Sequence, residues 1–125
     1  MFRPDVHKEL LRAARNRRTV TYGHLMRKFR ISRGHPKGAG IVGVIGAIDR
    51  REYEKGGPGF AAIVVRKDTG YPGGGYFCYD DLPDHLRRPK GQGTNPRLSR
   101  AEREYIEGEQ RKIWRYYRKR SSGGG

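Results

Sequence analysis

The pattern of apolar and polar residues is clearest in the middle of the chain, where it predicts a β-hairpin. Residues Ala61 to Val65 form a short apolar run rich in β-branched side chains, which is typical of a buried strand. A polar turn rich in glycine and proline follows, and Gly75 to Tyr79 then form a second, aromatic strand. The tip of this hairpin would carry Arg66 and Lys67.

Three helical segments are expected before the hairpin. The first runs from Phe2 to Arg18, the second from Tyr22 to Phe29 with Thr21 as its N-cap, and the third from about Lys37 to Glu54. Glycine is costly inside a helix, so the glycines of the third segment indicate the close approach of another backbone, from a neighbouring helix or a ligand. These glycines are Gly38, Gly40, Gly43 and Gly46.

A fourth helix is expected at the C-terminal end. Ser99 and Glu102 have the spacing of a capping box, which opens a helix that continues to about Arg120. Its apolar and aromatic residues recur at helical spacing, so we expect this stripe to pack on the core of the chain or on a second copy in a homodimer. The stripe consists of Tyr105, Ile106, Ile113, Trp114, Tyr116 and Tyr117.

This order of elements predicts an α+β fold of the winged helix-turn-helix type, with a two-stranded hairpin and an added C-terminal helix. The winged helix-turn-helix domain would span residues 1–86. A basic linker rich in proline and glycine (87–98), the basic amphipathic helix (99–120) and a flexible tail (121–125) would follow.

The charge of the chain favours a polyanionic partner. Lysine and arginine number 28 against 13 aspartate and glutamate, which gives a net charge of +15. Both ends are basic and the middle is slightly acidic. Nucleic acid is therefore the expected partner, ahead of an acidic protein or a membrane surface, and duplex DNA is preferred over RNA because of the predicted fold.

The expected DNA contacts lie around the second and third helices and at the hairpin tip, where side chains can reach phosphates or base edges. They are Thr21, Tyr22, Arg27, Lys28, Arg30, Arg33, His35, Lys37, Arg66 and Lys67. Further contacts with the DNA backbone are expected from Arg87, Arg88, Lys90, Arg111, Arg115 and Arg118.

Residues that could support catalysis are present but show no arrangement typical of an enzyme. The acidic pair Asp80 and Asp81 follows a predicted strand, where a charged corner explains it better than a metal site does. The histidines lack zinc-ligand spacing, and the glycine-rich hairpin tip lacks the P-loop pattern. We therefore expect no enzyme activity, no metal and no cofactor.

Cysteine usage and hydropathy indicate a cytoplasmic protein. The single cysteine, Cys78, excludes an internal disulfide and lies in an aromatic strand, where a thiol is usually inert. No apolar run reaches the roughly 18 residues of a membrane span, so we expect no membrane partner.

The segments VTYGHL, from Val20 to Leu25, and IVGVIGAID, from Ile41 to Asp49, resemble the helix-turn-helix of alkylguanine DNA alkyltransferases and alkyltransferase-like proteins. The resemblance implies that Tyr22 contacts a DNA phosphate. The arginine that this family inserts into the base stack falls on Gly40 here. The PCHR motif of the alkyl-accepting cysteine is absent and Cys78 does not replace it, so alkyl transfer is not expected.

The segment from Arg18 to Arg118 is similar to small, largely uncharacterised bacterial and phage proteins. These join a VTYG-type start to a hairpin like ALVVNKxTGxPGxGFF and a C-terminal helix with spaced Trp and Tyr. AAIVVRKDTGYPGGGYF matches that hairpin, with Arg66 in place of the usual Asn. The resemblance implies a fold but no activity, because these proteins are largely uncharacterised.

Three functions therefore remain. The preferred one is a DNA-binding protein, sequence-tolerant or modestly specific, of regulatory, phage or plasmid type. The second is an RNA-binding protein or ribonucleoprotein component that uses the arginine-rich linker and the aromatic helix. The third is a protein-interaction module that inhibits a nucleic-acid enzyme.

Overall fold

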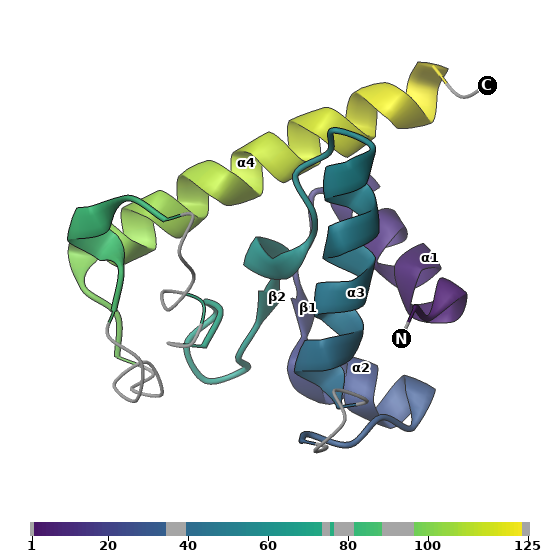
Figure 1. Ribbon diagram of the computed structural model, residues 1–125, viewed down its shortest axis with the longest axis horizontal. Helices are drawn as coiled ribbons and strands as arrows, with labels where there is room; N and C mark the ends of the chain where they lie inside the picture. The colour runs from purple at the N-terminus through teal and green to yellow at the C-terminus, as the bar shows by residue number, and fades with distance from the viewer. Residues whose placement is uncertain (1, 35–39, 74–75, 77–81, 89–96, 124–125) are drawn as a thin grey trace.

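The computed structural model describes residues 2–34, 40–73, 76, 82–88 and 97–123. These residues form an α+β fold with four α-helices and a small sheet of two parallel strands (Figure 1). The helices and strands are α1 (Pro4–Arg15), β1 (Val20–Thr21), α2 (Tyr22–Phe29), α3 (Ile41–Glu54), β2 (Val64–Val65) and α4 (Arg100–Gly123). Short 3-10 helices span Ala61–Ile63 and Asp84–Leu86.

The N-terminal half of the chain follows its local signals closely. α1 begins at Pro4, where the missing N–H of proline costs no hydrogen bond, and it ends at Arg15, short of the predicted Arg18. α2 has the predicted bounds. The prediction of Thr21 as its N-cap is confirmed, because the Thr21 hydroxyl accepts a hydrogen bond from the backbone N–H of His24 at 3.1 Å.

The sheet differs from the predicted hairpin. β2 pairs in parallel with β1, with Val20 opposite Val64 and Thr21 opposite Val65. The prediction of a strand from Ala61 was wrong over its first three residues, which form a 3-10 helix. The second predicted strand, at 75–79, lies outside the described residues apart from Tyr76.

The glycines of α3 have different surroundings. A Cβ on Gly40, the N-cap residue, would lie 3.0 Å from the carbonyl oxygen of Arg33, so the expected close backbone approach is confirmed there. A Cβ on Gly46 would meet no atom within 4 Å, so the same expectation was wrong for Gly46. Gly38 lies outside the described residues, as does the predicted helix start at 37–39.

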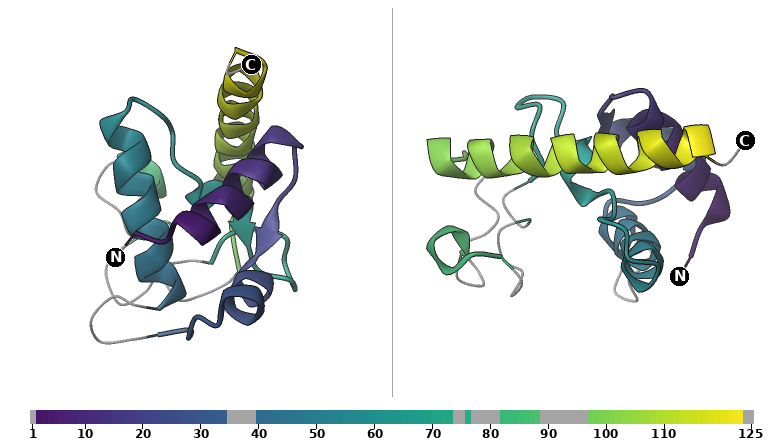
Figure 2. Two further views of the ribbon diagram at one scale, coloured as in Figure 1. Left: turned by 90° about the vertical axis from the view of Figure 1, so that its right-hand side faces the viewer. Right: turned by 90° about the horizontal axis from the view of Figure 1, so that it is seen from above.

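One hydrophobic core joins α1, α2, α3, the sheet and the C-terminal half of α4. Phe60 is fully buried at its centre and stacks on Tyr117 of α4, with ring centroids 4.6 Å apart. Ile113 of α4 is also buried in this core, so packing of the aromatic stripe within the chain is confirmed. α4 crosses the end of α3 and lies against α1 (Figures 1 and 2).

A second, smaller cluster lies at the start of α4 and consists of Leu82, Leu86, Leu98 and Ile106. The predicted capping box is confirmed beside it. The Glu102 carboxylate accepts from the Ser99 N–H at 2.8 Å, and the Ser99 hydroxyl accepts from the Glu102 N–H at 3.1 Å. The helix continues to Gly123, beyond the predicted end at Arg120.

Candidate nucleic-acid interface

The parallel sheet brings two basic segments to one edge. Parallel strands have their C-terminal ends at the same edge of the sheet, so the start of α2 after Thr21 lies beside the turn that follows Val65. This edge and the start of α3 form the lower end of the molecule in Figure 1. Thr21 pairs with Val65, so Tyr22 and Arg66, the residues that follow them, leave the sheet at the same edge. The pKa of Arg66 is raised mainly by its hydrogen bonds to Asp68.

The turn after β2 is closed by its own hydrogen bonds. The Arg66 N–H donates to the Tyr71 carbonyl at 2.9 Å, and the Gly70 N–H donates to the Arg66 carbonyl at 2.9 Å. The Arg66 guanidinium binds the Asp68 carboxylate through two bonds of 2.9 and 2.7 Å. Lys67 is exposed in this turn, so it can contact a partner without breaking a described ion pair.

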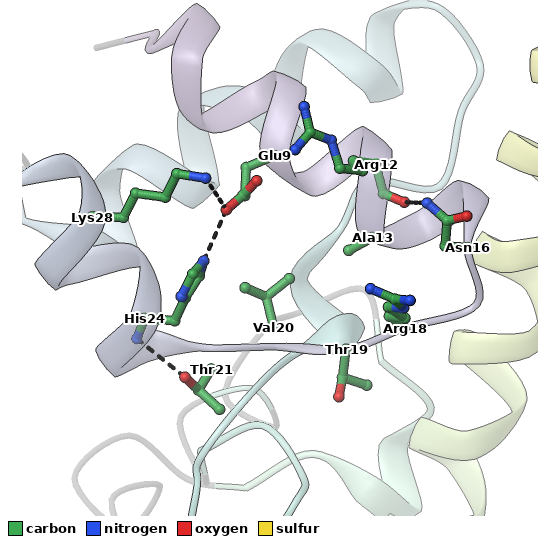
Figure 3. A pocket seen from close by; sticks show the side chains of 10 residues that line it. All are labelled: Glu9, Arg12, Ala13, Asn16, Arg18, Thr19, Val20, Thr21, His24 and Lys28. Atoms are coloured by element: carbon green, nitrogen blue, oxygen red, sulfur yellow. Dashed lines mark hydrogen bonds and ion pairs between the residues drawn. The ribbon is translucent and has the colours of Figure 1, made fainter.

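α2 carries two different polar faces. His24 and Lys28 share one face, where both side chains reach Glu9 of α1 at 2.8 and 2.9 Å (Figure 3). These bonds, from His24 first and then Lys28, lower the pKa of the Glu9 carboxyl. Arg27 lies four residues after Gly23 on another face, is exposed, and has no ion pair with a described residue.

The face of α2 with His24 and Lys28 borders an open hollow of about 440 Å³ between α1, β1 and α2. Figure 3 shows Arg18 and Asn16 at the opposite end of this hollow, beside α4. Because Glu9 pairs with Lys28 inside it, the positive charge of the hollow is partly neutralised. Lys28, an expected DNA contact, is therefore already engaged within the chain.

The outer face of α3 is apolar at its N-terminal end. Val42 is 60% exposed and Gly46, one turn further along, is exposed as well. Arg50 and Tyr53 continue this exposed side toward the C-terminal end. The first two turns of α3 thus present no hydrogen-bonding side chain outward.

The remaining expected contacts fall into several groups. Arg30 and Arg33 are exposed between α2 and α3, whereas His35 and Lys37 lie outside the described residues. Arg87 pairs with Asp84 at 3.0 Å, and Lys90 lies outside the described residues. Arg88 is only 15% exposed and binds Glu102 at 2.7 Å, so its role is to hold the start of α4.

Three further expected contacts on α4 lie far from the α2–α3 end. These are Arg111, Arg115 and Arg118, and all three are exposed. Three arginines at the end of α1 and in the turn after it, which were not among the expected contacts, lie near α4, where Trp114 donates to the carbonyl oxygen of Arg18. They are Arg15, Arg17 and Arg18. The only sequence signal was the crowding of arginines at the end of the first helix, which the helix dipole also explains.

The described part of the chain contains no group of three or more histidine, cysteine, aspartate or glutamate side chains that could hold a metal ion. Asp49 instead binds backbone N–H groups, and Asp80, Asp81 and Cys78 lie outside the described residues. Within the same described ranges, no helix has the length and apolarity needed to cross a membrane.

In comparisons with known proteins, no protein-family model, no curated protein and no solved structure matches the chain.

Proposed function

We propose that this protein binds duplex DNA through a winged helix-turn-helix surface at its α2–α3 end. We call this surface the DNA face and define it by Thr21, Tyr22, Arg27, Arg30, Arg33, Arg66 and Lys67. The observation that carries the proposal is the parallel β1–β2 pairing, which puts the basic turn after β2 beside the N-terminus of α2. The turn then takes the position of a wing, and α3 that of the recognition helix.

The roles of these residues follow from their surroundings. Tyr22 at the start of α2 and Lys67 in the turn lie on the two sides of the sheet edge, where each can bind a phosphate oxygen. Arg27 and Arg33 are exposed cations without a described ion pair, so binding a phosphate costs them no internal bond. Arg66 would have to share its guanidinium with Asp68.

The composition of α3 supports sequence-tolerant binding. Direct reading of bases in the major groove requires side chains such as arginine, asparagine or glutamine that form paired hydrogen bonds. Val42 and Gly46 occupy the outward side of the first two turns, and neither supplies such a group. α3 would therefore enter the groove through apolar contact, with most of the affinity coming from phosphate contacts.

Salt-dependent binding of a random-sequence duplex tests this proposal. The slope of log affinity against log salt changes by about 0.9 for each lost phosphate contact, so Arg27→Gln with Lys67→Gln should flatten the slope by nearly 2. Lys8→Gln with Lys55→Gln removes the same charge from two exposed lysines outside the DNA face and should leave the slope nearly unchanged. Equal effects of the two double variants would count against the DNA face.

The same titration separates the other candidate functions. A hairpin RNA that binds tighter than the duplex at equal salt would favour the RNA-binding alternative. Weak binding of duplex, single strand and RNA alike would favour a protein partner, as would a pull-down that survives nuclease treatment.

A further inference from the structure

A second group of unpaired cations lies at the α4 end of the molecule. The turn after α1 reaches α4, where the indole N–H of Trp114 donates to the carbonyl oxygen of Arg18 at 3.1 Å. The guanidinium of Arg17 lies over the indole ring, 5.8 Å from its centroid. These two contacts fix the end of α1 against α4.

Helical spacing extends this group along α4. Arg111 precedes Trp114 by three residues and Arg118 follows it by four, so all three lie on one stripe of the helix, with Arg115 next to it. Together with the arginines of the turn they form a surface that we call the basic ridge. It consists of Arg15, Arg17, Arg18, Arg111, Arg115 and Arg118.

The charge of the basic ridge is not neutralised within the described part of the chain. All six side chains are exposed, and none forms an ion pair with a described carboxylate. Elsewhere several cations are held in internal pairs, as with Lys28 on Glu9 and Arg88 on Glu102. Six like charges on one surface repel one another, so a bound polyanion is the partner that relieves the repulsion.

The basic ridge and the DNA face lie at opposite ends of the fold. α4 runs along the top of Figure 1, whereas α2 and the start of α3 lie at the bottom. Seen from above, α3 and the turn after α1 emerge on opposite sides of α4 (Figure 2). Between the two surfaces, Glu9 pairs with Lys28 in the hollow and interrupts the positive charge.

We propose that the basic ridge binds the phosphate backbone of a second DNA duplex, so that one chain bridges two duplex segments. This inference rests on the proposed function in one respect, which is that the DNA face binds the first of the two duplexes. The ridge offers arginines and no groove-reading element, so its binding is expected to be independent of sequence and strongly dependent on salt.

The number of duplexes bound per chain tests the proposal. A duplex of about 12 base pairs is about 40 Å long, close to the roughly 36 Å length of the 24-residue helix α4. One such duplex can therefore cover either surface, and the number bound per chain distinguishes two separate sites from one continuous footprint. At low salt, sedimentation velocity should give two duplexes per wild-type chain. At a DNA concentration that just saturates the wild-type chain, Arg115→Gln with Arg118→Gln should leave about one duplex, because the weakened site stays largely empty. Arg27→Gln with Lys67→Gln should do the same, whereas the Lys8→Gln with Lys55→Gln control should keep two.

Other outcomes would overturn the proposal or separate it from the proposed function. One duplex per wild-type chain, weakened by both double variants, would mean a single continuous footprint and no bridging. Two duplexes retained after the Arg115 and Arg118 substitutions would place the second site elsewhere. Loss of one duplex with Arg115→Gln and Arg118→Gln, but not with Arg27→Gln and Lys67→Gln, would support DNA binding by the basic ridge and contradict the proposed DNA face. A hairpin RNA that displaces the ridge-bound duplex more readily than unlabelled duplex would assign the ridge to RNA.

Discussion

The carboxylate of Asp49 on α3 accepts a hydrogen bond from the backbone N–H of Phe60 at 2.6 Å and a second from Ala61 at 3.2 Å. These bonds fix the start of the 3-10 helix that leads into β2. Burial raises the pKa of Asp49 to about 7; the two N–H donors oppose this rise, and the charge of nearby Glu52 adds to it. The segment that leads into β2 is therefore held by a carboxyl group whose pKa lies near neutral pH.

The contribution of Asp49 to stability should fall as pH rises from about 4 to 7. The pKa of Asp49 is 3.8 when it is unperturbed and about 7 in the folded chain, so over this interval the folded state holds more protons than the unfolded state. Its contribution to the slope of unfolding free energy approaches about −1.4 kcal/mol per pH unit. Urea unfolding at pH 5, 6 and 7 measures this slope, which should be shallower in Asp49→Asn. Equal slopes of unfolding free energy against pH in the two proteins would contradict a raised pKa of Asp49.

Gly59→Ala should destabilise the fold by about 2 kcal/mol or more. Gly59 has φ +75°, which an L side chain rarely adopts, and an added Cβ would lie 2.8 Å from the Cγ of Asp49. Thermal or urea unfolding measures the loss. Gly46→Ala is the matched control, because its Cβ meets no atom within 4 Å in the middle of α3, and it should stabilise by about 0.5–1 kcal/mol.

Glu102→Gln should cost about 2 kcal/mol of stability. Glu102 is 10% exposed, binds Arg88 at 2.7 and 2.8 Å, and accepts the N–H of Ser99, so its neutralisation leaves Arg88 without its ion pair. Glu104→Gln breaks the Arg100–Glu104 pair on the surface of the same helix and should cost less than about 0.5 kcal/mol. Similar losses in the two variants would show that burial of the Arg88–Glu102 pair contributes little.

Local signals in the sequence were sufficient for the helices. Thr21 and the Ser99–Glu102 pair are caps whose partners lie within three residues, so their residue types predict the bonds that form. α2 accordingly has the predicted bounds, and α4 begins beside the predicted cap.

Contacts between distant segments were not predictable in this way. A two-residue strand such as Val64–Val65 has too few positions to show which face it buries or which strand it pairs with. Its partner, β1, precedes it by more than forty positions, and Asp49 of α3, which binds the N–H of Phe60 ahead of β2, is eleven positions away from that residue. The part of the basic ridge that was not predicted, Arg15, Arg17 and Arg18, was missed for the same reason, because Trp114 and Arg18 meet only in the folded chain.

Trp114 provides a direct optical test of the basic ridge. It is the only tryptophan of the chain, and Arg17 lies over its ring, so tryptophan emission, excited at a wavelength that the eight tyrosines do not absorb, comes from this surface. We expect a duplex to change the Trp114 emission as Arg17 is drawn toward a phosphate. The same change should persist in Arg27→Gln with Lys67→Gln, because those residues lie at the other end of the molecule.

The variant Arg115→Gln with Arg118→Gln provides a control for this measurement. In Arg115→Gln with Arg118→Gln the indole and its bond to Arg18 remain, so the emission of the free protein should match that of the wild type. The change on adding duplex should require a higher DNA concentration, because two phosphate contacts of the ridge are gone. An emission change that needs Arg27 and Lys67 but not Arg115 and Arg118 would mean that Trp114 senses DNA bound at the far end, and the ridge would then have no duplex of its own.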